Sequence, residues 1–173
     1  HAEHNGSTGN SFAAGALNRD GYMFSVNTPL RPFGYGLSYT SFSYESFRLS
    51  IAPDGRSEAS VVVRNTGFMD GDEVFSSWAV ASIVRPVQEL IGICRVSLLA
   101  GEARTVRFSF NLNQLAFPDE HGVWQLEAGE FTFFVGGHSA DVRAEASYTL
   151  AQGRRLDPAG RSFFAEASVL AEE

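Results

Sequence analysis

Two groups of acidic residues are the first candidates for chemistry. One group is Asp70, Asp72 and Glu73, and the other is Asp119 and Glu120. Neighbouring carboxyl groups serve general acid–base catalysis when burial or a nearby charge separates their pKa values. Both groups fall where the sequence predicts turns, in which acidic side chains commonly bind backbone amides. We therefore interpret both groups as structural and predict no catalytic residue in this chain.

The histidines and glycines form no pattern that binds a metal or a cofactor. His1, His4, His121 and His138 lack the spacing of a zinc site, and no ladder of oxygen ligands predicts calcium. The segment Gly34-Tyr35-Gly36 lacks the third glycine of a dinucleotide-binding fingerprint. The sequence therefore predicts neither a metal nor a cofactor.

Aromatic side chains are the remaining functional candidates. An exposed ring can form a platform for a sugar, which makes Trp124 a candidate sugar-stacking residue. Trp78 lies in an apolar strand pattern and is expected in the core. Phe33, Tyr35 and Tyr39 stand in a glycine-rich arm, where we expect them to form contacts between domains.

Composition excludes several classes of partner. The 173 residues suit one domain with an extension, and the net charge is −7 with only 13 Lys and Arg residues. Nucleic acids and anionic membranes require clustered basic residues, so neither is an expected partner. No apolar run approaches the roughly 20 residues that a membrane span needs. Cys94 has no second cysteine to pair with, and we predict that it is a small buried hydrophobic residue.

The fold that must position these residues is indicated by period-two alternation from residue 42 onward. Turn residues separate segments at 42–51 (with a bulge), 59–63, 74–80, 89–98, 105–110, 123–126, 131–135 and 142–150. About seven strands at this spacing predict an all-β chain, a fibronectin III/immunoglobulin-like two-sheet sandwich with an extended N-terminal arm. Residues 113–117 suit one helical turn, and residues 163–170 suit either a helix or a strand.

The domain organisation predicted from these patterns has three parts. Residues 1–40 form an arm, residues 41–150 form the sandwich, and residues 151–173 form a C-terminal tail. The chain starts without methionine in a polar stretch. We therefore expect a fragment or a processed product of a longer protein.

An ordered series of motifs resembles the C-terminal region of family 3 glycoside hydrolases of the β-glucosidase/β-xylosidase type. The motifs are NTPLRPFGYGLSYT at 27–40, VRNTG at 63–67, GDEV at 71–74, RPVQELIG at 85–92, GEARTV at 101–106 and GEFTFFVG at 129–136. Each motif is weak alone, but the series in this order is strong. Departures at Gln88, Cys94 and Ala100 leave the substrate subclass open.

The resemblance implies that the catalytic residues lie in other domains of the parent enzyme. Such enzymes join a barrel, an α/β sandwich and a C-terminal fibronectin type III-like domain, with the nucleophile and the acid/base residue upstream of the junction motif. Residues 1–40 would then be the junction from the α/β sandwich. No position here matches either catalytic motif, so the resemblance carries over no catalytic residue.

The leading hypothesis is a non-catalytic accessory domain whose partners are the catalytic domains of a parent glycosidase. That parent would hydrolyse terminal β-linked sugars by a retaining two-carboxylate mechanism. Two alternatives remain open: an independent carbohydrate-binding module for oligosaccharides, and one chain of a nicked or multi-chain β-glucosidase. Exposed apolar surface would also favour self-association. Compartment is not indicated, and secreted, periplasmic and cytoplasmic parents all remain open.

Overall fold

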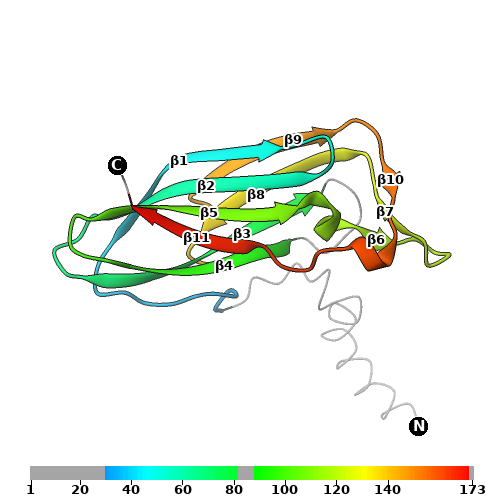
Figure 1. Ribbon diagram of the computed structural model, residues 1–173. Helices are drawn as coiled ribbons and strands as arrows, with labels where there is room; N and C mark the ends of the chain where they lie inside the picture. The colour runs from blue at the N-terminus through cyan, green and yellow to red at the C-terminus, as the bar shows by residue number, and fades with distance from the viewer. Residues whose placement is uncertain (1–29, 82–87, 172–173) are drawn as a thin grey trace, which may run out of the picture.

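The computed structural model describes residues 30–81 and 88–171, and these form a β-sandwich (Figure 1). Sheet A has the strand order β1 (Phe42–Ile51), β2 (Arg56–Asn65), β5 (Ala103–Asn111) and β11 (Glu166–Ala171). Sheet B has the order β4 (Glu89–Leu98), β3 (Gly71–Ala81), β8 (Gly129–Gly136) and β9 (Ala144–Leu150). All neighbouring strands within these two sheets are antiparallel, which confirms the predicted sandwich class.

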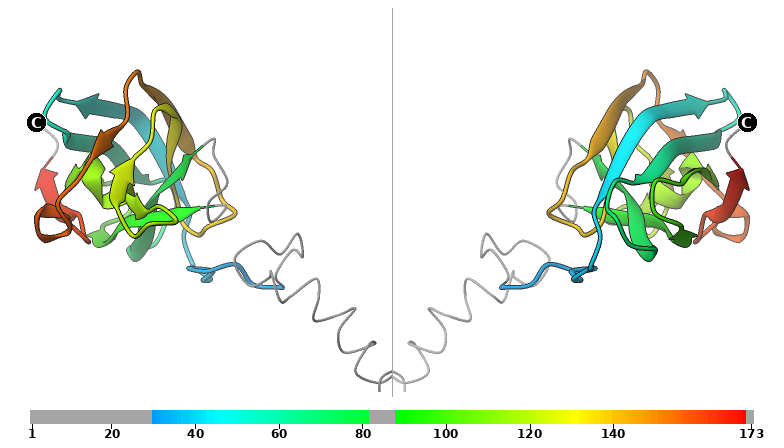
Figure 2. Two further views of the ribbon diagram at one scale, coloured as in Figure 1. Left: turned by 90° about the vertical axis from the view of Figure 1, so that its right-hand side faces the viewer. Right: turned by 90° about the vertical axis from the view of Figure 1, so that its left-hand side faces the viewer.

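The two sheets lie face to face, and the views from the two ends show them as separate layers (Figure 2). Alternation drives this packing: Ala59, Val61 and Val63 on β2 are buried, while the residues between them are only partly covered. The largest fully buried side chains include Phe75, Phe108, Phe131 and Phe133. Phe75 of β3 meets Phe108 of β5 edge-on at a ring-centroid distance of 5.7 Å.

The predicted bulge is present in β1. Its pairing with β2 shifts register between Glu45 and Arg48, and Ser46 has a φ of 52°. The shift keeps Tyr44 and Leu49 both packed against the core, although an odd spacing along a regular strand would put them on opposite faces. The bulge therefore corrects the imperfect alternation of this strand.

A small third sheet covers one end of the sandwich, on the right in Figure 1. Its strands are β10 (Arg154–Arg155), β7 (Trp124–Leu126) and β6 (Phe117–Pro118), and two short 3₁₀ helices flank it, η1 (Leu112–Leu115) and η2 (Pro158–Gly160). The expected helical turn is thus η1, capped by the Asn111 side chain. Strands β6 and β10 and helix η2 have no sequence signal because each is only two or three residues long.

The C-terminal segment, which suited either helix or strand, forms β11 at the edge of sheet A. It pairs with β5 from Glu166 opposite Ser109 to Ala171 opposite Arg104. Residues 1–29 of the expected arm, and Arg85, Pro86 and Val87 of one motif, lie outside the described residues. Among those described, no helix has the length and hydropathy that crossing a membrane requires.

Candidate functional site at the junction segment

The site is built around residues 30–41, called here the junction segment, which leads into β1. A turn opens it, in which the Tyr35 amide donates to the Pro32 carbonyl over 3.0 Å. Gly34 has a φ of 87°, and a Cβ placed on it would lie 3.3 Å from the Gly137 carbonyl oxygen. Glycine is therefore favoured here by the positive φ, and any other side chain would also crowd the Gly137 carbonyl.

Phe33 anchors the junction segment to the sandwich. Its ring meets Trp78 edge-on at 5.8 Å, and its carbonyl accepts a 2.9 Å hydrogen bond from the Ser139 amide. Trp78 is buried, as the sequence predicts, and its indole nitrogen donates to the Ser76 hydroxyl over 2.6 Å. Phe33 nevertheless remains 61% exposed, so its outer surface is available to another part of the protein.

The two tyrosines of the segment behave differently. The Tyr35 ring lies against His138 at 5.6 Å, whereas Tyr39 is 97% exposed. The structure therefore places Phe33 and Tyr35 against the sandwich and leaves Tyr39 projecting from it. Contacts of these three residues with another domain stay a prediction.

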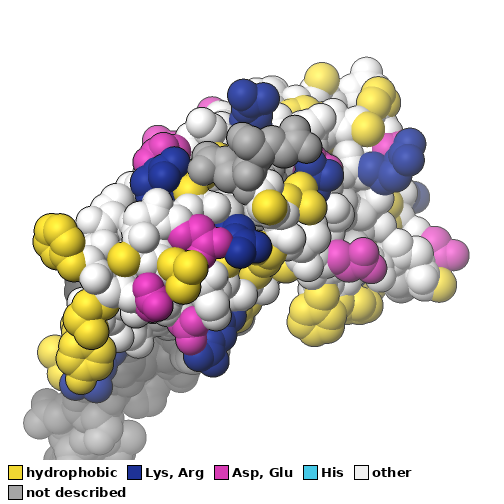
Figure 3. Space-filling view, turned by 60° about the vertical axis from the view of Figure 1, so that its left-hand side comes forward, with side chains coloured by type: hydrophobic (Ala, Val, Ile, Leu, Met, Phe, Trp, Pro, Cys, Tyr) yellow, Lys and Arg dark blue, Asp and Glu magenta, His cyan; other side chains and the backbone are white. Residues whose placement is uncertain are grey.

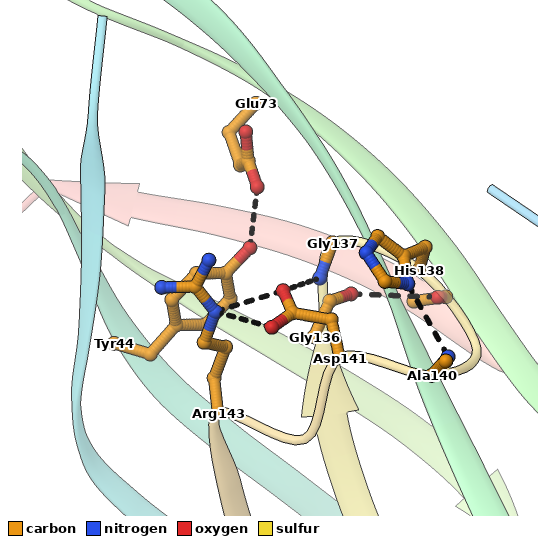
Figure 4. Close-up of polar contacts among 9 residues, drawn as sticks. Tyr44, Glu73, Gly136, Gly137, His138, Ala140, Asp141 and Arg143 are labelled. Carbon is orange, nitrogen blue, oxygen red and sulfur yellow. Dashed lines mark hydrogen bonds and ion pairs between the residues drawn. The ribbon is translucent and has the colours of Figure 1, made fainter. Parts of the chain in front are cut away.

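Beneath the junction segment lies a polar cluster of four side chains (Figure 4). The Tyr44 hydroxyl donates to Glu73 Oε1 over 2.6 Å. Arg143 Nε donates to both oxygens of Asp141, at 2.7 and 2.8 Å, and its guanidinium lies 5.8 Å from the Tyr44 ring centroid. The cluster thus joins β1, β3 and the loop that follows β8.

Burial sets the proton affinities in this cluster. It raises the pKa of Glu73 above the ordinary value of 4.5, because the carboxylate loses solvent, and the Tyr44 and Arg143 contacts only partly offset this. Burial also raises the pKa of Tyr44, reinforced by its hydrogen bond to Glu73. Tyr44 is therefore a neutral hydrogen-bond donor, and Glu73 takes up a proton more readily than an exposed glutamate.

A cavity of about 420 Å³ lies between the junction segment and this cluster. Tyr44, Glu73, Asp141, Arg143 and His138 contribute to its lining. Among the described residues, no group of three or more His, Cys, Asp or Glu side chains is arranged to hold a metal ion. Tyr44 and Arg143 bind the two carboxyl groups of the cluster, and these contacts link three segments of the chain.

Asn65 is a second organising residue at this end, and it is fully buried. Its Oδ1 accepts from the Thr40 hydroxyl at 2.7 Å and from the Gly67 amide at 3.1 Å. Its Nδ2 donates to the carbonyls of Met69 and Leu98, at 2.8 and 3.2 Å. One side chain thus fixes the junction segment, the loop at 66–70 and the end of β4.

The other candidate residues form contacts within the domain itself. The Arg161 guanidinium lies over the Trp124 ring at 4.4 Å, so one face of the indole is already occupied. Asp119 binds the amides of His121 and Val123, as expected for a turn carboxylate. Cys94 is buried as predicted, and burial raises the pKa of its thiol.

Comparison with known proteins places this geometry in a family. The family model for the fibronectin type III-like domain matches residues 73–139. A periplasmic beta-glucosidase of Salmonella typhimurium is 39% identical over 128 residues, covering 70% of this chain and 17% of that protein. A beta-xylosidase of Formosa agariphila is 41% identical over 136 residues, covering 75% of this chain and 19% of that protein.

The solved structure of the GH3 beta-glucosidase from Bifidobacterium adolescentis matches with a TM-score of 0.65 and 32% identity, over 73% of this chain and 20% of that one. This chain carries a fibronectin type III-like domain of the family 3 glycoside hydrolase type. It spans a fifth or less of the length of these relatives. The motif series recognised in the sequence therefore belongs to one domain of much longer enzymes.

Sequence reasoning missed two parts of the site in this fibronectin type III-like domain. Glu73 was assigned to a solvated turn, but it lies in β3 and is half-buried. Tyr44 lies in the strand expected at 42–51 and Glu73 directly precedes the strand expected at 74–80, but only the packing of sheet A on sheet B brings the two side chains together. Asn65 lies within the VRNTG motif, and nothing in its neighbours predicts its bond to Thr40, 25 residues away.

Proposed function

We propose that this domain is a non-catalytic structural part of a family 3 glycosidase, holding a fixed position relative to the catalytic domains. The observation that carries the proposal is the fixed junction segment. Phe33, Tyr35 and Thr40 each contact the sandwich, so the polypeptide entering the domain is not a free tether. A domain attached in this way resists rotation about its linker.

The parent enzyme would hydrolyse terminal β-linked sugars by the retaining mechanism, which uses two carboxyl groups about 5–5.5 Å apart. We place that pair in the rest of the polypeptide. Two observations support this placement. The chain spans only 17% of the Salmonella beta-glucosidase, and the half-buried Glu73 is bound to a phenol rather than facing a second free carboxylate.

The test compares this chain with the full-length polypeptide that contains it. With aryl β-glucosides and aryl β-xylosides, the full-length protein should hydrolyse at least one substrate and the isolated chain none. Robust turnover by the isolated chain would overturn the proposal. So would full activity and unchanged thermal unfolding after residues 30–171 are removed from the full-length protein.

Binding of oligosaccharides by the domain itself is a separate question. Arg161 covers one face of Trp124, which leaves this ring less suited to stacking than a free indole. A calorimetric titration of the chain with cello- and xylo-oligosaccharides should therefore show no saturable heat. Saturable binding that Trp124→Ala abolishes would make the domain a carbohydrate-binding module instead.

A further inference from the structure

A strap formed by residues 161–171, called here the tail strap, runs along one side of the sandwich. On that side, β4 of sheet B and β5 of sheet A lie close together (Figure 1). The Ala165 amide donates to the Ile91 carbonyl of β4 over 3.2 Å, and from Glu166 onward the strap pairs with β5. The match to the family model ends at residue 139, so the strap lies outside the matched part of the chain.

The first part of the tail strap, residues 161–165, is anchored by side chains of η1. The buried Gln114 amide donates to the Phe163 carbonyl over 3.1 Å, and Asn113 Oδ1 accepts a 2.8 Å hydrogen bond from the Ser162 hydroxyl. Leaving a buried amide without its partner costs free energy. This part of the strap should therefore stay in place when the residues after it open.

The second part of the tail strap, β11, is held in a different way. All six of its residues are exposed, and even Val169 and Leu170 keep 41% and 40% of their surface in contact with solvent. The strand is attached through its pairing with residues 104–109 of β5. Segments that bury little apolar surface open locally at a lower free energy than the core does. We therefore expect β11 to be the part of the strap that opens first.

Opening of β11 would turn β5 into the edge of sheet A. β5 pairs with β2 on its other side and is continuous in register with both neighbours, so no bulge interrupts it. An edge strand of this kind is a template for a strand from another molecule. Figure 3, in which the left-hand side of Figure 1 comes forward, shows hydrophobic side chains in separate groups among acidic and basic ones. Association on this side would therefore depend on the backbone of the edge more than on a continuous apolar patch.

We propose that β11 guards the edge of β5 and thereby keeps two copies of this chain apart. The occupant of an unguarded edge is a second copy, because two identical β5 edges can pair antiparallel around a two-fold axis. Pairing centred on Val106 sets Arg107 opposite Thr105 of the second copy, so like charges do not meet directly. The buried Val106 and Phe108 keep facing the core of their own sandwich. Guarding requires no catalytic domain, so this role stands apart from the proposed function.

Two truncations test the guard. A chain that ends at Ala165 lacks β11 and keeps the anchor, whereas a chain that ends at Ala171 keeps both and is the matched control. In sedimentation velocity, the chain ending at Ala165 should dimerise at a roughly tenfold lower protein concentration than the control. An excess of a synthetic peptide with the sequence of residues 165–171 should return it to the monomer, and a scrambled peptide should not. A folded chain ending at Ala165 that stays monomeric, or a dimer that the peptide leaves intact, would overturn the inference.

A second variant keeps the chain at full length. Adjacent amides of a strand point to opposite sides, so Ser168→Pro with Val169→Pro removes one donor to β5 whichever of the two it is. Ser168→Ala with Val169→Ala leaves the backbone bonds in place and is the control. Amide hydrogen exchange at residues 104–109 should accelerate about tenfold in the proline variant, which should also dimerise, and stay unchanged in the alanine variant. A proline variant that stays monomeric at every concentration would overturn the inference, even if the truncated chain failed to fold.

Discussion

Each end of the sandwich is held by a buried side-chain amide, but the two amides tie different kinds of segment. At the junction end, the buried Asn65 amide binds four partners and holds a loop whose apolar residues project outward. At the tail end, around η1 and residues 154–165, the buried Gln114 amide donates to the carbonyls of Ile91 and Phe163, both at 3.1 Å. There the bonded segment folds back over the core.

The tail end is closed by further polar ties. Asn113 binds the Gly160 carbonyl at 2.6 Å and the Ser162 hydroxyl at 2.8 Å, and Arg161 donates to the Gln114 carbonyl at 3.0 Å. These bonds bring β11 onto the edge of sheet A. The comparison teaches that order and burial are separate properties: Phe163 and Phe164 at the tail end and Phe68 at the junction end all stay exposed although hydrogen bonds fix the segments that carry them.

The largest effect should come from Asn65→Ala at the junction end. The substitution removes four hydrogen bonds and leaves buried backbone groups of Met69 and Leu98 without this partner, so unfolding free energy should fall by about 3 kcal/mol. Urea denaturation measures it. Thr66→Ala, which removes a single exposed side-chain bond to Ser41, is the control and should cost much less. Equal losses from the two substitutions would show that Asn65 does not organise this end.

Gln114→Ala should have the next largest effect, about 2 kcal/mol, because Nε2 loses its bonds to the Ile91 and Phe163 carbonyls and a longer one to Leu90, while the Oε1 atom has no hydrogen-bond partner to lose. The comparison predicts that the damage is local. Amide hydrogen exchange should accelerate in residues 161–171 and stay unchanged in the loop at 66–70. Acceleration at both ends alike would mean that the two ends are not independent.

Glu73 should make the junction end sensitive to pH. Its pKa is raised by burial, so the folded state binds its proton more tightly than the unfolded state. This stabilisation is fully present below the ordinary carboxyl pKa and is lost as pH rises through the raised value. Glu73→Gln is permanently neutral, so it should be more stable relative to wild type at pH 7 than at pH 4. A parallel pH dependence of the two proteins would contradict this assignment, and Glu145→Gln, on an exposed position of β9, is the matched control.

The smallest effect in the isolated chain should come from Phe68→Ser. A fully exposed ring contributes little to folding, so unfolding free energy should change by no more than about 0.5 kcal/mol. Phe164→Ser should behave in the same way by the same denaturation assay. A loss above 1.5 kcal/mol for Phe68 alone would show that the ring packs within this domain rather than being displayed by it.

Much of the fold follows from local patterns in the chain. The bounds of β4 agree with the segment expected at 89–98, and the bulge in β1 and the buried positions of Trp78 and Cys94 are confirmed. These features depend on alternation and on turn residues, which act over a few neighbouring positions. Strands β6 and β10 could not be predicted, because two-residue strands exist only through the partners that pair with them.

The sequence by itself determined the sandwich class, the positions of the main strands along the chain and the family that its motifs resemble. Only the tertiary structure decided which polar residues matter. Tyr44 meets Glu73, and Asn65 meets Thr40, across separations of 29 and 25 residues. The physical reason is that alternation assigns a residue to a face of a strand, whereas a hydrogen bond between distant segments depends on how strands pair, how the two sheets pack and how loops close, none of which a local pattern contains.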